Sequence, residues 1–500
     1  MDKNFDQFRR SFLALVEIEE DEGDAETGGW VTLDSVAMDG GDPFWEGDAG
    51  LLTMRAAIRK IVSKFPEILG LDGSWVQVVV ASRLDGESVP ATVVMFGDTE
   101  EMPLVGIMSV EAVAETLPAN FLSWAMLEHE PRARAGFIAG VLDLSLRHAG
   151  NLAVAAYDVG QGNCNAIVDS YGHPRIFFDL GWAPNFHAAT RPAAKPELFS
   201  CDGHALAPVI LSHWDMDHWS YAIAASSYNP SSLTTRHTWN EDALRRFWIA
   251  RPPQVQKHQL GPLTISFYGA LSTRQLLPGF GSLLLWPDGV KRIGFSDGWV
   301  EACKAAPQVK DDRNNNGLAV FVRPAGRGPV VALTGDADFP AIPSFSQRRK
   351  LSLAGMVAPH HGSRVTASHV PSPKRGGPGR LVMSVGKGNS YGHPKQQAID
   401  VYQGLGWSAV ATQDRFKCED PSVPHDHVHG NLLLTFSQEQ HNPVCGCTCV
   451  PDGKLCLVPI DVEPTAVTPG TRRRKMRAEK GPKQPRKKTR KRRLNAIAIS

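Results

Sequence analysis

The sequence predicts a protein of the α/β (α+β) class, which two of its features favour, and a third feature sets a C-terminal tail apart from the folded part. Short apolar runs recur between residues 152 and 385, and the turns after them carry aspartate, histidine or glycine. Such runs are typical of buried strands. Before residue 150, β-branched runs alternate with apolar residues at helical spacing. After residue 470, Lys and Arg dominate a stretch that Pro and Gly interrupt, as in disordered tails.

Length and composition predict several domains. A chain of 500 residues exceeds what one core holds, and its 42% hydrophobic and 21% charged residues are ordinary for globular proteins. We expect an accessory α+β domain over residues 1–150, a larger domain over residues 151–465 and a disordered basic tail over residues 466–500. We expect no transmembrane segment and a cytoplasmic location, because no apolar run approaches a membrane span and the N-terminus lacks the features of a signal peptide.

The N-terminal domain is expected to begin with an amphipathic helix over residues 3–19. Its apolar residues recur at helical spacing: Phe5, Phe8, Phe12, Leu15 and Val16. Further expected elements are a helix over residues 51–69, strands over 75–81 and 91–96, and a helix over 119–147. No catalytic constellation stands out here. We therefore interpret this domain as accessory, serving substrate selection or assembly with a protein partner.

The densest group of metal-ligand side chains follows an apolar strand expected over residues 208–211. His213, Asp215, Asp217 and His218 lie within six positions of one another. Burial of two imidazoles and two carboxylates beside a strand end is costly unless a cation lies among them. The alternative is a surface turn that happens to contain these residue types. A helix is expected next, over residues 219–226.

Three later apolar runs deliver further candidate ligands. Residues 330–334 lead to Asp336, residues 356–359 lead to His360 and His361, and residues 381–385 lead through a Gly-rich turn to His393. Antiparallel strands are expected upstream, over residues 152–158, 163–169 and 175–180. Repetition of this pattern in one domain favours a single shared site.

These motifs resemble the metallo-β-lactamase superfamily and, within it, the ComEC-type branch, the hydrolase domain of DNA-uptake competence proteins. The matching strings stand in the family's order over roughly residues 152–440: Asp158-Val-Gly-Gln-Gly162, Ser212-His-Trp-Asp-Met-Asp-His218, Asn314-Asn-Asn-Gly317, Leu333-Thr-Gly-Asp336, Pro359-His-His-Gly-Ser363 and Ser390-Tyr-Gly-His-Pro394. The resemblance implies an αββα sandwich, two packed sheets with helices outside, and makes residues 151–465 a metallo-β-lactamase-like hydrolase domain.

The resemblance also implies two divalent metal ions. Their ligands would be His213 and Asp215 for the first, Asp217 and His218 for the second, and Asp336 as a bridge between them. One of His360 and His361 would complete the second set. We favour His361 as the ligand and expect His360 to face the substrate.

The chain departs from the superfamily pattern at several positions. The histidine of the third motif has no clear counterpart, and His237 and His258 are candidates by position only. Asn316 lies in the Asn-rich stretch that occupies this region in the branch, so we assign it a polar role. Asn163 stands where the family has aspartate, a change that could weaken the support of the ligands.

The predicted chemistry follows from the ligand types. Carboxylate oxygens with some imidazole suit Zn²⁺ or Mn²⁺, and the sequence does not choose between them. Two such ions make a hydroxide available near neutral pH and neutralise charge on a phosphoryl group. The predicted catalytic residues are Asp217, His360, His393 and Asn316. His360 or His393 would protonate the leaving oxygen or hold the phosphate, although His393 could instead make a structural hydrogen bond within its turn.

We expect a metal-dependent phosphodiesterase or nuclease, acting in nucleic-acid processing or in defence against phage. Residues 471–500 carry fourteen Lys and Arg against one acid, so the remaining residues carry a net −12 in a chain of net charge +1. Such a tail binds phosphates by counterion release, although it also suits membranes, acidic proteins or ribosomes. The alternatives are a metallohydrolase on a phosphocholine ester, lactone or thioester, and a non-catalytic binding protein that keeps the fold.

Four cysteines form a second candidate metal site. Cys445, Cys447, Cys449 and Cys456 lie within twelve positions and could hold a structural Zn²⁺. Their spacing lacks the usual gap of two residues. The alternative is a hairpin with reduced cysteines.

Overall fold

The computed structural model describes these residues: 8–20, 27–38, 50–113, 117, 119–193, 195–199, 206–277, 280–346, 351–375, 379–417, 428–436 and 458–459. The chain divides into two compact units, Met1–Asp461 and Val462–Ser500. The predicted tail and the four cysteines of the candidate zinc site lie outside the described residues. Within the described ranges, no helix has the length and apolar character needed to cross a membrane.

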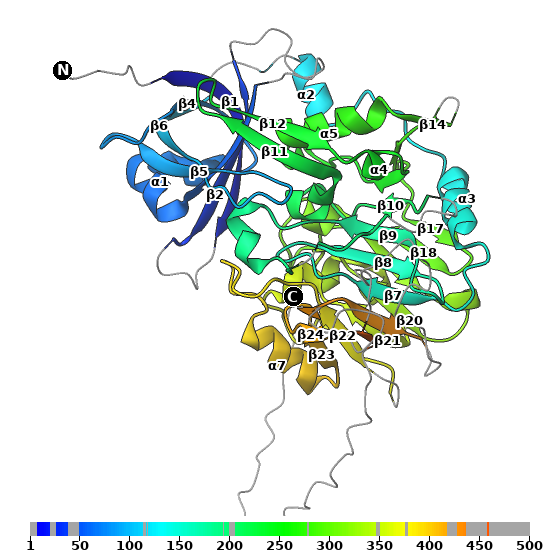
Figure 1. Ribbon diagram of the computed structural model, residues 1–500. Coiled ribbons are helices and arrows are strands. Elements are labelled where there is room, and N and C mark those ends of the chain that lie inside the picture. The colour runs from blue at the N-terminus through cyan, green and yellow to red at the C-terminus, as the bar shows by residue number, and fades with distance from the viewer. Residues whose placement is uncertain are drawn as a thin grey trace, which may run out of the picture. The chain divides into compact units, whose positions relative to one another are not determined.

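The N-terminal strands close into an antiparallel barrel of six strands. They are β1 (Arg9–Glu20), β2 (Gly29–Ala37), β3 (Leu51–Ala57), β4 (Trp75–Ala81), β5 (Val89–Val93) and β6 (Leu104–Ala112). They pair in the order β3-β2-β1-β4-β6-β5, and β5 pairs back onto β3, with Val93 opposite Met54. Figure 1 shows these strands grouped in blue tones. The ring encloses an apolar core of its own.

The predicted helix over residues 3–19 is wrong, because Arg9–Glu20 forms β1. Phe12 and Val16 belong to the core inside the barrel, whereas Leu15 belongs to a second core outside it. A strand with both faces covered carries apolar residues on both, so its sequence does not alternate and can imitate helical spacing. The helix predicted over residues 51–69 likewise starts as β3, and only Ile58–Lys64 forms an α-helix, α1.

Outside the barrel, two mixed sheets make up most of the Met1–Asp461 unit. The first has the order β16-β13-β10-β9-β8-β7-β26-β27, and the second has the order β17-β18-β19-β20-β21-β22-β23. Strands of the first sheet are β7 (Ala153–Ala156), β8 (Cys164–Val168), β9 (Pro174–Leu180), β10 (Val209–Ile210), β13 (Trp248–Ala250), β16 (Leu283–Leu285), β26 (Leu432–Thr435) and β27 (Val458–Pro459). Strands of the second are β17 (Arg292–Phe295), β18 (Gly298–Ala302), β19 (Leu318–Val322), β20 (Val330–Leu333), β21 (Leu353–Val357), β22 (Arg380–Met383) and β23 (Ser408–Ala411). One apolar core includes Phe178 and Ile210 of the first sheet and Val320 and Val357 of the second.

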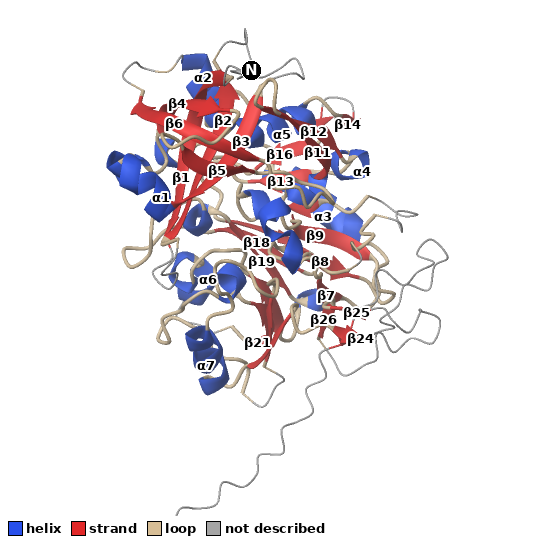
Figure 2. Ribbon diagram, turned by 60° about the vertical axis from the view of Figure 1, so that its left-hand side comes forward, coloured by secondary structure: helices blue, strands red, loops and turns tan. Residues whose placement is uncertain are grey.

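The predicted αββα sandwich is wrong. Of the described residues, 34% lie in strands and 23% in helices, and the strands include the closed barrel (Figure 2). The α-helices among the described residues are short: α1, α2 (Ala119–Ala125), α3 (Ala135–Leu146), α4 (Glu241–Leu244), α5 (Pro262–Ser272), α6 (Pro343–Ser346) and α7 (Gln396–Gly404). Barrel residues Leu15, Val36 and Leu51 share a core with Phe177 and Leu211 of the first sheet and its following turn. The barrel therefore packs against the first sheet, in a place where an αββα sandwich would have helices.

The segment after the ligand motif also differs from its prediction. The helix expected over residues 219–226 is wrong, because β11 (Ile223–Asn229) begins within it and pairs with β12 (Thr234–Trp239). Thr235 of β12 pairs with Leu51 of β3, so this hairpin extends the sheet of the barrel (Figure 1). The hairpin therefore connects the ligand motif directly to the N-terminal strands.

Candidate metal centre

Three strands deliver the candidate ligands to one place. β10 leads into the turn that carries His213 and His218, β20 leads to Asp336, and β21 leads to His361. Ligand atoms of His213, His218 and Asp336 lie within 4.8 Å of one another, and so do those of Asp217, His218 and His361. The two groups share His218.

Atoms of the first group, and of Asp215 beside it, lie close together. His213 Nε2 is 3.2 Å from Asp215 Oδ2, and His218 Nε2 is 3.4 Å from Asp336 Oδ1. Yet neither of these nitrogens nor Asp336 Oδ1 has a hydrogen-bond partner among the described residues, although all three atoms are buried. Unsatisfied buried polar atoms are costly, and a cation coordinated by them would remove that cost. The donor set fits a divalent ion of the Zn²⁺ or Mn²⁺ type.

The second group surrounds Asp217. His361 Nε2 lies 3.1 Å from Asp217 Oδ2 and 3.8 Å from Asp336 Oδ2, and His218 Nε2 lies 3.8 Å from Asp217 Oδ1. His361 Nδ1 donates to the backbone oxygen of Ser384 at 2.7 Å, which turns Nε2 toward Asp217, where an ion would find it as a ligand. Asp336 therefore faces both groups, as a bridging ligand would.

His360 and His361 are adjacent but lie in different surroundings. Both adopt the left-handed backbone conformation, with φ of 48° and 53°, which is uncommon outside glycine. Their rings lie at 86° to each other. The His361 side chain is buried in the cluster, whereas that of His360 is 46% exposed, with Nδ1 3.8 Å from Asp336 Oδ2. The turn thus sends one ring to the ligands and the other to the cleft above them.

Asp179, at the end of β9, supports the cluster and was not singled out from the sequence. It accepts hydrogen bonds from His218 Nδ1 at 2.9 Å, from the backbone and side chain of Ser212 at 2.6 and 2.8 Å, and from Asn163 Nδ2 at 2.8 Å. A partner of this kind directs the other ring nitrogen of His218 toward an ion. The signal in the sequence was a carboxylate within an apolar strand, followed closely by Gly181.

Mutual attraction keeps the carboxylates of the cluster ionised. Burial raises the pKa of Asp336, but His218 and His361 outweigh it and lower that pKa well below the ordinary value. Conversely, burial lowers the pKa of His218, but Asp336, Asp179 and Asp217 outweigh it and raise that pKa well above the ordinary value. Protons on the imidazoles and a divalent ion thus compete for the same carboxylates.

Other predicted residues are held away from the ligands. Asn316 donates to Asp311 Oδ1 at 2.8 Å and to the backbone oxygen of Asp312 at 2.7 Å, so the structure does not bring its side chain into the cluster. His237 lies on β12, where Nδ1 is 2.9 Å from Ser226 Oγ. His258 Nε2 donates to the backbone oxygen of Asp311 at 3.1 Å. Neither histidine joins the two ligand groups in the described part of the chain.

His393 lies near His360, with ring centroids 5.9 Å apart. The side chain of Asn389 holds its backbone N–H at 3.1 Å and its backbone oxygen at 2.7 Å. Burial, and then His360 and His361, lowers the pKa of His393 to about 2, so its ring is neutral at physiological pH. A neutral imidazole offers one N–H donor and one acceptor, which suits hydrogen bonding better than charge neutralisation.

A cavity of about 850 Å³ lies over the cluster. One wall carries Asp217, Asp336 and the histidines 360, 361 and 393. Residues 15–19 of β1 line the cavity from the barrel. Arg364 and Lys395 also line it, each just after a histidine-bearing turn. The barrel and the ligand turns therefore share this cavity.

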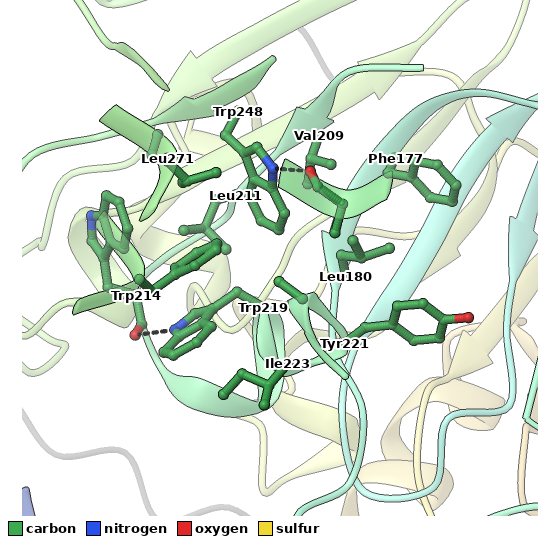
Figure 3. Packing of buried hydrophobic residues seen from close by; sticks show 14 of the residues in the cluster. Phe177, Leu180, Val209, Leu211, Trp214, Trp219, Tyr221, Ile223, Trp248 and Leu271 are labelled. Atoms are coloured by element: carbon green, nitrogen blue, oxygen red, sulfur yellow. Dashed lines mark hydrogen bonds between the residues drawn. The ribbon is translucent and has the colours of Figure 1, made fainter. Parts of the chain in front are cut away.

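Tryptophans fix the turn that carries four of the candidate ligands. Trp219 is fully buried and stacks on Phe267 with ring centroids 4.4 Å apart. Its Nε1 donates to the backbone oxygen of Trp214 at 2.9 Å, as Figure 3 shows. The ligand turn is thus anchored in the core of the unit.

No protein-family model matches the chain, and no curated protein has a matching sequence. The assignment of this centre therefore depends on its geometry and on the motifs that form it.

Proposed function

We propose that the chain is a metal-dependent hydrolase that cleaves phosphodiesters. The observation that carries the proposal is the convergence of His213, His218 and Asp336, whose ligand atoms lie within 4.8 Å of one another. The buried atoms His213 Nε2, His218 Nε2 and Asp336 Oδ1 lack hydrogen-bond partners within the described chain. The motif order that resembles the ComEC-type branch of the metallo-β-lactamase superfamily supports it. The proposed location is the cytoplasm.

The ligand sets would be those of two divalent ions. His213, Asp215 and Asp336 would hold the first, and Asp217, His218, His361 and Asp336 would hold the second. His218 lies in both groups of neighbouring ligand atoms and is assigned to the second ion, as the resemblance implies. When bound, such ions lower the pKa of water toward neutrality and neutralise charge that develops on a phosphoryl group.

Residues of the cleft would then act on the substrate. His360 is half exposed beside Asp336, so its imidazole can give a proton to the leaving oxygen or hold a phosphate oxygen. His393 can donate one hydrogen bond to the same phosphoryl group. Arg364 and Lys395 would attract the anionic substrate to these turns.

Nucleic acid is the polymer that the basic tail favours, because a run of Lys and Arg binds phosphates by counterion release. A small phosphoester is the second candidate substrate. It is favoured by the pairing of cleft cations with acids: Lys257 Nζ lies 3.2 Å from Asp311 Oδ2, and Lys310 Nζ lies 3.4 Å from Asp72 Oδ2. These pairs reduce the attraction that the cleft itself offers to a polyanion.

The proposal is tested by assaying the purified chain with Zn²⁺ and Mn²⁺ on single- and double-stranded DNA, RNA and bis-nitrophenyl phosphate. The controls are the Asp217→Ala/His218→Ala double variant and a chain that lacks residues 471–500. We expect polymer cleavage that the double variant loses, and weaker polymer binding with unchanged dye hydrolysis after deletion of the tail. Activity on small esters alone would favour the second candidate. Absence of metal-dependent hydrolysis on every substrate would contradict the proposal.

A further inference from the structure

We infer that the six-stranded barrel helps to position a ligand of the metal centre, through contacts that run from Glu17 of the barrel to Arg313 and from Arg313 to Asp215. Neither residue belongs to the proposed ligand set. The inference rests on the proposed metal site and adds two positioning residues to it, one of them on a strand of the barrel.

A single guanidinium nitrogen connects the barrel to a candidate ligand. Arg313 Nη2 lies 2.6 Å from Glu17 Oε1 and 3.0 Å from Asp215 Oδ1. Glu17 is on β1, and Arg313 is in the loop before β19. The Arg313 side chain is 17% exposed, so water screens these ion pairs less than it screens pairs on the surface.

This contact divides the two oxygens of Asp215 between two partners. Oδ1 faces Arg313, whereas Oδ2 lies 3.2 Å from His213 Nε2 and remains available to an ion. A partner behind a ligating carboxylate typically contributes a factor of about 10–100 to metal affinity. Glu17 offsets the positive charge of Arg313, which would otherwise repel a cation beside it. Arg313 thus orients the ligand, and Glu17 makes that arrangement compatible with an ion.

The barrel is also fixed against the site at a second point. The Arg55 side chain, on β3, is 3% exposed, and its guanidinium carbon lies over the rings of Trp30 and Phe186, 4.3 and 4.2 Å from their centroids. It donates to the Tyr391 hydroxyl at 2.9 Å and to Glu19 Oε2 at 3.2 Å. Tyr391 precedes His393 by two positions. These contacts hold the barrel, and with it Glu17, in a fixed position beside the cleft.

The test is the Zn²⁺ affinity of the full chain, measured by competition with a chromophoric chelator. We expect Arg313→Met to weaken one Zn²⁺ site by about 10–100-fold, Glu17→Gln to weaken it less, and Arg313→Lys to restore most of the affinity. The matched control is Arg292→Met, because Arg292 forms a comparable pair with Glu301 at 2.8 Å and does not line the cleft. That variant should bind Zn²⁺ as the wild type does.

A second measurement separates positioning from a general loss of structure. With Co²⁺ in place of Zn²⁺, the visible absorption bands should shift in Arg313→Met and Glu17→Gln but not in Arg292→Met. Unchanged or tighter Zn²⁺ binding in Arg313→Met would overturn the inference, since it would mean that Arg313 only repels the ion. If Arg313→Met does not fold, Glu17→Gln decides by the same criteria. Absence of Zn²⁺ binding by the wild-type chain would instead refute the proposed metal site itself.

Discussion

Asp179 is the residue that most directly fixes the geometry of the ligands. Its carboxylate accepts a hydrogen bond from His218 Nδ1 and also holds Ser212, the residue before His213. It adopts a φ of 63°, a conformation that costs free energy in a non-glycine residue and persists where the surroundings impose it. We interpret this strain as the consequence of directing one carboxylate toward several donors at the end of β9.

We expect Asp179→Asn to lower Zn²⁺ affinity by about 10–100-fold, because an amide is a weaker acceptor for His218 and its NH₂ group meets other donors. Asp169→Asn is the matched control. Asp169 is also buried and accepts from the backbone N–H groups of Tyr171 and His173 and from Arg175, but it lies in the turn between β8 and β9, before the start of β9. Chelator competition on both variants checks the prediction. An equal loss in the two variants would indicate a general effect of buried charge.

Contacts between elements set the position of the ligand turn. Gly181 follows β9, and a Cβ atom there would lie 1.8 Å from the backbone oxygen of Asp217. We expect Gly181→Ala to displace this turn, to weaken Zn²⁺ binding and to lower the free energy of unfolding by about 1–3 kcal/mol. Gly294→Ala, on β17, meets open space and should change both quantities little. Urea unfolding with metal titration distinguishes them, and normal Zn²⁺ affinity in Gly181→Ala would contradict the expectation.

A carboxylate of the barrel also caps helix α5, which lies outside the barrel. Asp34, on β2, accepts the backbone N–H of Leu263 in the first turn of α5 at 3.1 Å and the hydroxyl of Thr53 at 2.9 Å. Burial, and then the charge of Glu17, raises the pKa of Asp34 from 3.8 to about 7. A carboxyl whose pKa is higher in the folded state stabilises it fully below the unfolded value and loses that contribution as the pH rises through the folded value.

We therefore expect the wild-type chain to lose up to about 4 kcal/mol of stability from Asp34 as the pH rises from about 4 to about 7. In Asp34→Asn this part of the pH dependence should disappear, because the amide does not ionise. Urea midpoints measured across that range provide the check. The same slope in the variant and the wild type would mean that Asp34 is already ionised without cost.

At the scale of the whole molecule, the candidate ligands could be found from the sequence because the Asp and His side chains directly follow the apolar strands that position them. His213 to His218 form one short run, and the strands predicted over residues 330–334 and 381–385 agree with Val330–Leu333 and Arg380–Met383. Parallel pairing of β20, β21 and β22 sets their carboxyl ends side by side. An apolar run followed by Asp or His was therefore enough to predict one shared site, whereas the choice of Asp336 and His361 as its ligands came from the family resemblance.

The barrel and its contacts could not be predicted in the same way. Closure depends on pairing between β3 and β5, which no local pattern reveals, and β1 has apolar residues on both faces. Glu17 and Arg313 stand 296 positions apart, and each is an ordinary charged residue in its own segment. Only the folded chain brings them to Asp215, so this part of the candidate site had no signal in the sequence.

The central claim is that the two ligand groups hold divalent ions, and anomalous diffraction from crystals of the full chain grown with Zn²⁺ or Mn²⁺ tests it most directly. We expect anomalous peaks at about 2.0–2.2 Å from His213 Nε2 and from His361 Nε2, with Asp336 between them. Crystals that contain the metal but show no anomalous peak within coordinating distance of these residues would contradict the account.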